Sequence, residues 1–289
     1  MKKFFYILSA AAAVMFVSSC GKDDPTPDGG NGVLKSYERA VMMSGEVHFR
    51  YVYTPVWGSD GKLTSVKMEH YENPFDWETG KTQGEFLAEK ETITYTWNNS
   101  AYTAELKETN EWYDISNGTW TPGNGYSASL KFDNKWRVTE LKSYYSDGAT
   151  GSSASYIYNG EYLASWKTGD DYTYTWKDGD MVAVAREGYS ARITYLDEAN
   201  PFADSVDPLL TFFDDCYALG LAGKRTAHLP STIVETWGSG GDTSTSYSKY
   251  IYKKDGSGRI IEADVMYTDA DGKVDEGYEG HYNAVKFNY

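Results

Sequence analysis

The sequence predicts an all-β protein, an antiparallel β-meander that curves into an open or half-closed barrel with one helix on its concave side. Aromatic residues make up 16% of the chain and alternate with small or polar residues in short runs. This period of two is typical of strands that are buried on one face. Asp-Gly, Asn-Gly and similar pairs follow many of these runs and predict hairpin turns. Because a single hairpin is marginally stable, the hairpins must share one sheet.

The first element in chain order is an export signal over residues 1–19. Lys2 and Lys3 precede an apolar run from Phe4 to Val17, which is too short for a permanent transmembrane helix. The following Ser18-Ser19-Cys20 resembles the lipobox of bacterial lipoproteins. Cys20 is therefore the predicted lipid attachment site, because several acyl chains on one cysteine give stable membrane anchoring.

Residues 20–32 are predicted to form the lipidated cysteine and a disordered tether. The tether is rich in Gly, Pro and Asp and has no apolar side chain to bury. Its start, Lys22-Asp23-Asp24, is similar to the acidic surface-export signal of Bacteroidetes lipoproteins. That similarity implies a location on the outer membrane, lipid-anchored and facing the exterior; the alternative is an ordinary solvated charge run.

Residues 33–289 are predicted to form a single β-rich domain of such hairpins. In the clearest one, Tyr172, Tyr174 and Trp176 alternate with threonines, and Asp178-Gly179 supplies the turn. The spacing between hairpins is irregular, which argues against a solenoid or a propeller. Two long segments, 73–90 and 111–126, are predicted as loops.

One segment departs from the strand pattern. Asp207-Pro208 offers a cap and a first-turn proline, apolar residues then recur at helical spacing, and Gly220 stops the run. A helix is therefore predicted over about 208–219. Its wide apolar face predicts packing against the concave side of the sheet.

The composition excludes several classes of function and partner. The chain carries a net charge of −15, which disfavours nucleic acid and basic-patch membrane binding. Cys216 is the only thiol after the signal, so no intramolecular disulfide is expected. No cofactor motif is present, and the oligomeric state is left open.

The late part of the chain contains the run Leu219-Gly220-Leu221-Ala222-Gly223, followed by Leu229-Pro230-Ser231. This arrangement resembles a group of Bacteroidetes surface lipoproteins that form a family of unknown function. The aromatic hairpins are also similar to the tyrosine-aspartate (YD or RHS-like) repeats of large bacterial surface proteins. The resemblance implies export and a β-barrel-like fold, and it carries over no catalytic residue.

Metal-binding and catalytic signatures are weak. Asp269, Asp271 and Asp275 have part of the spacing of a calcium-binding loop, but the flanking ligand positions hold tyrosines, so a plain Asp-Gly turn is the preferred interpretation and no metal is expected. Acidic residues that could form the carboxylate pair of a glycosidase are Asp214 with Asp215, Asp170 with Asp171, and the isolated Glu140 and Glu235.

The sequence therefore predicts a non-catalytic binding or interaction module. Tryptophans in or beside loops are the candidate contacts for a glycan or a surface protein, since aromatic rings anchor such interfaces. One alternative is a carbohydrate-active hydrolase that uses two carboxylates. The other is an envelope carrier that holds an apolar ligand between sheet and helix. The candidate tryptophans are Trp57, Trp77, Trp112, Trp120 and Trp237.

Overall fold

The structure is a computed structural model that describes residues 34–43, 45–59, 62–76, 81–203, 207–210, 221–239, 242–274 and 282–289. The predicted signal, Cys20 and the tether lie outside these ranges. The strands of the first half are β1 (Ser36–Met43), β2 (Glu46–Trp57), β3 (Leu63–Glu72), β4 (Phe75–Asp76), β5 (Lys81–Thr82), β6 (Phe86–Asn98), β7 (Thr103–Asp114), β8 (Thr119–Pro122), β9 (Ser127–Phe132) and β10 (Val138–Tyr144). Those of the second half are β11 (Thr150–Asn159), β12 (Tyr162–Thr168), β13 (Asp170–Lys177), β14 (Asp180–Arg186), β15 (Tyr189–Ala199), β16 (His228–Ser239), β17 (Asp242–Lys254), β18 (Ile260–Thr268) and β19 (Tyr282–Asn288).

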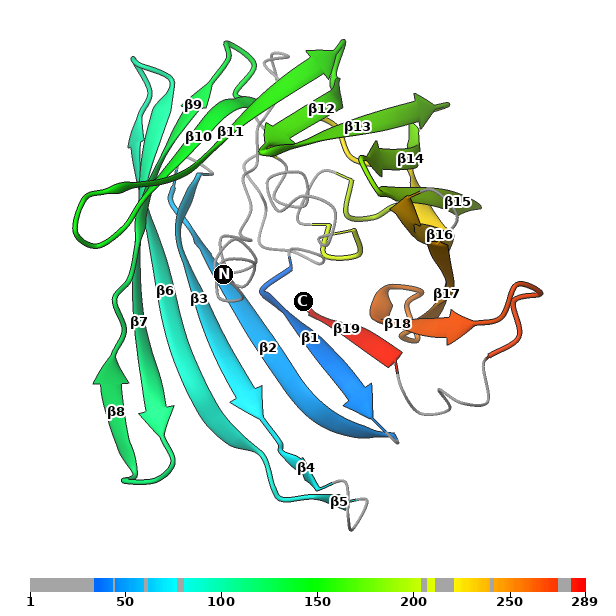
Figure 1. Cartoon of the computed structure of the whole chain (residues 1–289), viewed down its shortest axis with the longest axis horizontal. Helices are drawn as coiled ribbons and strands as arrows, with labels where there is room; N and C mark the ends of the chain where they lie inside the picture. The colour runs from blue at the N-terminus through cyan, green and yellow to red at the C-terminus, as the bar shows by residue number, and fades with distance from the viewer. Residues whose placement is uncertain are drawn as a thin grey trace.

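Sixteen of these strands form one closed antiparallel barrel (Figure 1). Neighbours along the chain pair in order, and β1 pairs with both β2 and β19, which joins the two ends of the chain. β8 extends one side of β7, and β4 pairs with β5 in a separate small hairpin. The all-β antiparallel prediction is confirmed.

The prediction of an open or half-closed barrel is wrong. Seven residues of β1, Ser36 to Met42, pair with Asn288 to Tyr282 of β19. An open sheet would leave the hydrogen-bonding groups of both terminal strands unpaired, and closure satisfies them. The hydrophobic pattern of a strand does not reveal its partner, so this pairing was not visible in the sequence.

The hairpin predicted around Asp178-Gly179 is confirmed. β13 and β14 pair up to Lys177 and Asp180, which leaves a two-residue loop. Asp178 and Gly179 have φ values of 52° and 92°. Positive φ at both central residues is the geometry that matches the twist of the flanking strands.

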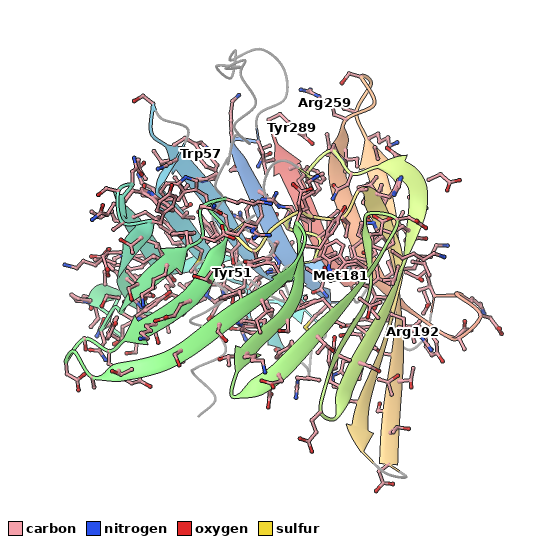
Figure 2. The ribbon with its side chains drawn as sticks, turned by 90° about the horizontal axis from the view of Figure 1, so that it is seen from above. Tyr51, Trp57, Met181, Arg192, Arg259 and Tyr289 are labelled. Carbon is pink, nitrogen blue, oxygen red and sulfur yellow. The ribbon has the colours of Figure 1, made fainter. Side chains whose placement is uncertain are left out.

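The barrel has two ends with different interiors. We call the end where β1 begins and β2 finishes the core end, and the opposite end, where β1 finishes and β2 begins, the cavity end. Figure 2 shows Trp57, Arg259 and Tyr289 along the core end. Inward side chains at the core end are apolar and buried, including Leu63, Ile93, Leu130, Leu163, Met181 and Val184.

The described residues of the connection between β15 and β16 pack inside the core end. Phe202 stacks on Phe287 with ring centroids 4.4 Å apart, and the Tyr250 hydroxyl donates to the Leu209 carbonyl at 2.9 Å. The Leu221 carbonyl accepts from the Val138 amide at 2.7 Å. The described part of this connection, residues 200–203, 207–210 and 221–227, therefore acts as a plug.

The predicted helix over 208–219 is not present in the part of the chain that the structure describes. Pro208 to Leu210 form a turn, and residues 211–219 lie outside the described ranges. Asp207 is fully buried, and its carboxylate accepts from the Leu209 amide at 3.1 Å and from the Asn200 amide at 3.0 Å. Asp207, which the sequence predicts as a helix cap, therefore stabilises a turn instead. No helix with the length and apolar character of a membrane span occurs within the described residues.

The outer face of the barrel is polar. Exposed large apolar side chains on it are single and lie on different strands, namely Val56, Ile157, Leu196, Ile251 and Ile261. Positions that alternate with the buried ones carry charges and threonines, for example Lys90, Thr94 and Thr96 on β6, Glu105, Lys107 and Glu111 on β7, and Asp171, Thr173 and Lys177 on β13. A barrel wall in lipid has an apolar band about 25 Å tall on this face.

Candidate functional site

The inner wall changes character along individual strands. On β6, Trp97, Tyr95 and Ile93 face inward at the core end, and the next two inward positions toward the cavity end are Glu91 and Glu89. Ile93 and Tyr95 are 1% and 6% exposed, so the apolar part of the strand is fully used for packing. At the cavity end, β6 therefore directs carboxylates inward in place of apolar side chains.

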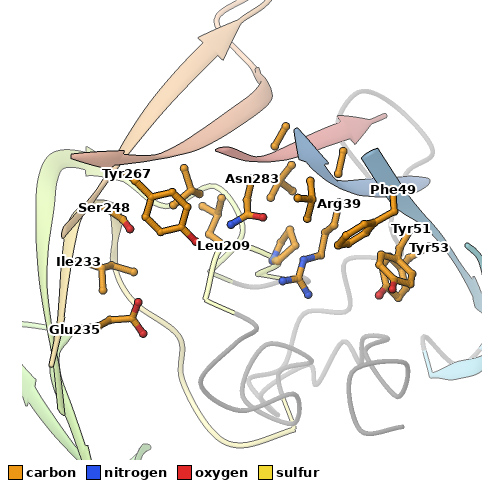
Figure 3. Close-up of a pocket in the computed structure, with 16 residues that line it drawn as sticks. Arg39, Phe49, Tyr51, Tyr53, Leu209, Ile233, Glu235, Ser248, Tyr267 and Asn283 are labelled. Carbon is orange, nitrogen blue, oxygen red and sulfur yellow. The ribbon is translucent and has the colours of Figure 1, made fainter. Parts of the chain in front are cut away.

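A cavity of about 430 Å³ lies inside the barrel below the plug. This volume falls in the range of small-molecule sites. Its walls come from β1 and β2 on one side, β16 to β19 on the other, and the turn at Pro208 (Figure 3). The lining residues are Arg39, Ala40, Val41, Phe49, Tyr51, Tyr53, Pro208, Leu209, Ile233, Glu235, Ser248, Val265, Tyr267, Asn283, Ala284 and Val285.

One wall of the cavity is an aromatic ladder on β1, β2 and β3. Tyr37 stacks on Tyr53 at 4.7 Å, and Tyr51 stacks on His70 at 4.3 Å. Phe49 meets Tyr51 edge to face at 5.9 Å. Such rings present flat apolar faces whose positions are fixed by their neighbours.

Arg39 is the one cationic side chain among the described residues that line the cavity. It lies on β1 opposite Tyr51 of β2 and Val285 of β19. Figure 3 shows its guanidinium pointing into the space between the strands, near Asn283. An arginine in this position offers five hydrogen-bond donors to a ligand.

Glu235 is the one carboxylate among the described lining residues, and it lies on the opposite wall, on β16. The Tyr189 hydroxyl donates to its Oε1 at 2.8 Å. Burial raises the pKa of Glu235, and the hydrogen bond from Tyr189 partly offsets that rise. The carboxyl group of Glu235 is therefore partly buried and fixed in position by its hydrogen bond from Tyr189.

A second group of acids lies further along the inner wall, beyond the aromatic ladder. Burial raises the pKa of Glu91 to about 9, with smaller contributions from Glu108 and Glu89. Burial likewise raises the pKa of Glu108 and that of Glu89 to about 7. Oε1 of Glu91 and Oε2 of Glu108 are buried without a hydrogen-bond partner among the described residues. We call these three residues the acid wall.

The neighbouring histidine does not neutralise the acid wall. His70 Nδ1 lies 4.0 Å from Glu89 Oε2. Burial lowers the pKa of His70 to about 4, so the imidazole is uncharged at neutral pH and the contact is not an ion pair. The described part of the chain holds no group of three or more metal-type side chains arranged around one point.

The tryptophans predicted to lie on loops lie on strands where the structure describes them, and their predicted binding role stays a prediction. Trp57 ends β2 and packs against the core. Trp112 lies on β7 and is 47% exposed, and Trp237 lies on β16 and is 38% exposed. Trp120 lies on β8 with the Lys90 ammonium 4.0 Å from its ring centroid. Trp77 lies outside the described residues.

The predicted loops over 73–90 and 111–126 are largely strand in the described ranges. β6 begins at Phe86, β7 runs to Asp114 and β8 covers Thr119–Pro122. Gly and Pro in these segments lie between short strands. Because these residues have low strand propensity, the sequence predicted loops over the whole segments. The structure does not gather the candidate tryptophans into one surface, because Trp112 faces the same side as Glu89 whereas Trp120 pairs with the outward Tyr113.

The remaining candidates fall in separate places. Asp269 accepts from the backbone amides of Asp271 and Lys273, as expected for a turn, and Asp275 lies outside the described residues, as do Asp214, Asp215 and Cys216. Asp170 and Asp171 are exposed and pair with Arg186 and Lys167. Glu140 pairs with Lys131 and Lys142 on the outside. Of the acids considered from the sequence that the structure describes, Glu235 is the one that lines the cavity.

Sequence reasoning missed Arg39 and the acid wall. A signal for the acid wall was present, since Glu89 and Glu91 share the parity of the apolar Ile93 and Tyr95 and must face inward with them. Arg39 alternates with Tyr37 in the same way. A charged residue at an inward position of a predicted strand indicates either that the strand register is predicted wrongly or that the residue belongs to a functional site.

Comparison with known proteins agrees with the fold and leaves the family open. No protein-family model matches the chain, and no curated protein matches it. Among solved structures it is similar to a porin-like protein from Bacteroides uniformis, with a TM-score of 0.58 and 15% identity over 88% of this chain and 96% of that chain. A porin-like protein from Bacteroides vulgatus aligns with a TM-score of 0.27 and 13% identity over 89% of this chain and 98% of that chain, too distant to support an argument. At these identities the first likeness concerns the fold alone.

Proposed function

We propose that this chain is a lipid-anchored envelope protein that binds a small ligand inside its barrel. The observation that carries the proposal is the cavity of about 430 Å³ below the plug, with an aromatic wall and a few convergent polar groups. An apolar pocket with few polar groups is the usual form of a ligand site. This is the carrier alternative drawn from the sequence, with the cavity between the plug and the wall.

The polar outer face supports attachment through a lipid rather than through the barrel wall. Lysines, glutamates and threonines alternate with buried residues along β6, β7 and β13, and a lysine at the middle of a bilayer costs about 2–4 kcal/mol. The barrel is therefore expected to stand in water beside the membrane. A lipid on Cys20 would hold it there, on the outer membrane and facing the exterior if the Lys22-Asp23-Asp24 signal acts as its likeness implies.

The cavity changes which of the sequence hypotheses is best supported. A binding module that uses loop aromatics needs its tryptophans together and exposed, and those described are dispersed over the barrel. A carrier needs an unfilled space of several hundred Å³, which is present. Non-catalytic binding therefore remains the proposal, with the contact surface moved from the loops to the interior.

The test is binding of a neutral fluorescent probe, N-phenylnaphthylamine, to the full chain. We expect fluorescence to rise on binding and the Val265→Trp variant, which fills the cavity, to lose most of this signal. Ile251→Trp on the outer face is the matched control and should bind as the unchanged chain does. Equal binding by Val265→Trp and the unchanged chain would contradict interior binding.

A second candidate function, hydrolysis of a glycosidic bond, is favoured by the acid wall. Glu91 and Glu108 lie on neighbouring strands at diagonal inward positions, where Cα atoms are typically about 7–8 Å apart. Glycosidases use two such carboxyl groups, of which one keeps its proton and the other is ionised.

Release of reducing sugar from a panel of polysaccharides tests this second candidate. If it holds, Glu91→Gln and Glu108→Gln each abolish the release, whereas Glu105→Gln on the outer face of β7 retains it. Absence of release by the unchanged chain on the whole panel would count against a hydrolase.

A further inference from the structure

We propose that the ligand of the cavity is a monoanion, an apolar or aromatic body with a single carboxylate, and that Arg39 binds the carboxylate. This inference rests on the proposed function, because it assigns the chemical class of ligand to the same cavity. It depends on four features of the described residues: an unpaired guanidinium, adjacent neutral donors, a flat apolar wall and the absence of a second cation.

The first feature is that Arg39 has no carboxylate or hydrogen-bond partner among the described residues, although it is half-buried. Other partly buried arginines are paired. Arg50 donates to Glu85 at 2.7 and 2.9 Å and to Glu38 at 3.2 Å. In the same way, Arg137 is paired with Asp133 and Arg186 with Asp170.

This contrast lies between two adjacent strands. Arg50 on β2 faces outward and is fully occupied, whereas Arg39 on β1 faces inward and is not. A half-buried guanidinium that no acceptor of the described residues occupies has its donors available, and an anionic ligand group is the usual partner for them. Arginine suits a carboxylate because its planar fork gives two parallel hydrogen bonds.

Neutral donors lie beside Arg39. Asn283 pairs with Val41 on β1, one inward position from Arg39, and its side chain is exposed to the cavity. Figure 3 shows both side chains directed into the same space. An amide N–H next to a guanidinium can donate to the same carboxylate without adding charge.

The body of the ligand is defined by the apolar wall. Phe49 and Tyr51 on one side and Val265 and Val285 on the other border the space next to Arg39, and Leu209 of the plug closes it. These side chains favour a hydrocarbon chain or a ring, and a polar body such as a sugar would leave its hydroxyl groups unpaired against them.

The charge balance favours a monoanion. A phosphate dianion needs more than one cation or several backbone donors, and Arg39 is the one cation among the described lining residues. Glu235 on the opposite wall and the net charge of −15 oppose a second negative charge. A cationic ligand is disfavoured because Glu235 is already held by Tyr189 and its pKa is raised by burial.

The experiment compares two carboxylates with their own neutral amides by calorimetry on the full chain at neutral pH. The probes are octanoate against octanamide, and phenylpropionate against phenylpropionamide. We expect each carboxylate to bind on the order of 10-fold more tightly than its amide, since a charge-assisted hydrogen bond contributes that much.

Arg39→Gln should remove this preference by weakening the carboxylate and leaving the amide unchanged. Arg192→Gln, which changes an exposed arginine on the outer face of β15 (Figure 2), is the matched control and should keep the preference. Arg39→Lys should retain part of it, because the charge remains and the fork is lost.

The outcomes separate this inference from the proposed function. If the neutral probe binds and Val265→Trp prevents it, but carboxylates and amides bind equally, the interior site stands and the assignment of a carboxylate is overturned. The assignment is overturned in the same way if Arg39→Gln keeps the carboxylate preference. If neither the neutral probe nor any carboxylate responds to Val265→Trp, the proposed function itself fails.

Discussion

The core end and the cavity end of the barrel share the same strands and differ in what those strands direct inward. β6 places Ile93 and Tyr95 in the core end and Glu91 and Glu89 in the cavity end. The outward positions of these strands are polar at both ends, so the difference concerns the interior. One end of the barrel therefore provides stability and leaves the other free to carry charges and empty space.

The plug follows the same division. Its described residues pack with Phe287 and Tyr250 at the core end, and Pro208 and Leu209 form the roof of the cavity. Asn200 and Asp207 of the plug are hydrogen-bonded to each other, whereas Oε1 of Glu91 and Oε2 of Glu108 below it are buried without hydrogen-bond partners among the described residues. Unpaired buried groups are costly and mark places where function opposes stability.

The comparison is tested most strongly by deleting matched apolar groups from the two ends. Leu163 at the core end is fully buried, so Leu163→Ala should cost about 2–5 kcal/mol of unfolding free energy. Val265→Ala at the cavity end faces existing space and should cost about 1 kcal/mol or less. Urea unfolding of both variants provides the measurement, and equal losses would break the distinction between the ends.

The next effect concerns pH and the acid wall. The pKa of Glu91 in the folded protein is raised from its ordinary value of 4.5 to about 9, so the folded state binds more protons than the unfolded state between these values. The contribution of Glu91 to the unfolding free energy is then fully present below about pH 4.5 and is lost as the pH rises toward 9.

A neutral isostere should remove this dependence. Glu91→Gln is expected to stabilise the protein at pH 8 by about 1–3 kcal/mol and to flatten the slope between pH 5 and 9. Glu105→Gln on the outer face of the neighbouring strand is the control. Thermal unfolding across this pH range is the measurement. Glu89 and Glu108, whose pKa values are raised to about 7, keep part of the slope, but a slope in Glu91→Gln as steep as that of the unchanged chain would show that Glu91 does not contribute.

A smaller effect is expected from the link between plug and wall. Tyr250→Phe removes the hydroxyl that donates to the Leu209 carbonyl and leaves a buried acceptor unpaired, at a cost of about 1–2 kcal/mol. Tyr102→Phe, at a tyrosine that is 38% exposed, should change the melting temperature little. No difference between the two variants would mean that the plug is held by packing alone.

The smallest effect is expected at the rim of the cavity end. Trp112 is 47% exposed, so Trp112→Ala should change the unfolding free energy by less than about 1 kcal/mol. Trp57→Ala, at a tryptophan packed against the core, should cost more. Differential scanning fluorimetry separates them, and a large loss for Trp112→Ala would place that side chain in the stabilising part of the fold.

Much of the β-structure could be predicted from local signals. The hairpin from Tyr172 to Val184 was predicted with its turn, because alternation and an Asp-Gly pair act within a few residues. The strands around Trp112 and Trp120 were assigned to loops, since their Gly, Pro and Asn neighbours outweighed a weak strand pattern. The run from Leu209 resembles a helix in its spacing, yet its described beginning is a turn held by Asp207 and Tyr250.

The site was much less accessible to sequence reasoning. Glu235 was one of several isolated acids among the 42 acidic residues of the chain, and its immediate neighbours did not distinguish it from the others. Its partner Tyr189 lies on the adjacent strand across the long plug connection. Arg39 was overlooked because its parity with one aromatic residue, Tyr37, is a weaker signal than the longer alternation that marks Glu89 and Glu91.

The sequence by itself determined that the chain forms antiparallel strands, where many of its tight turns fall and which side of most strands is buried, because these properties depend on neighbours along the chain. The tertiary structure alone decided that the sheet closes, since closure joins β1 to β19 from opposite ends of the chain. Closure also brings Arg39, Asn283 and Glu235 around one space. Residues that far apart in sequence meet only through the pairing of every strand between them.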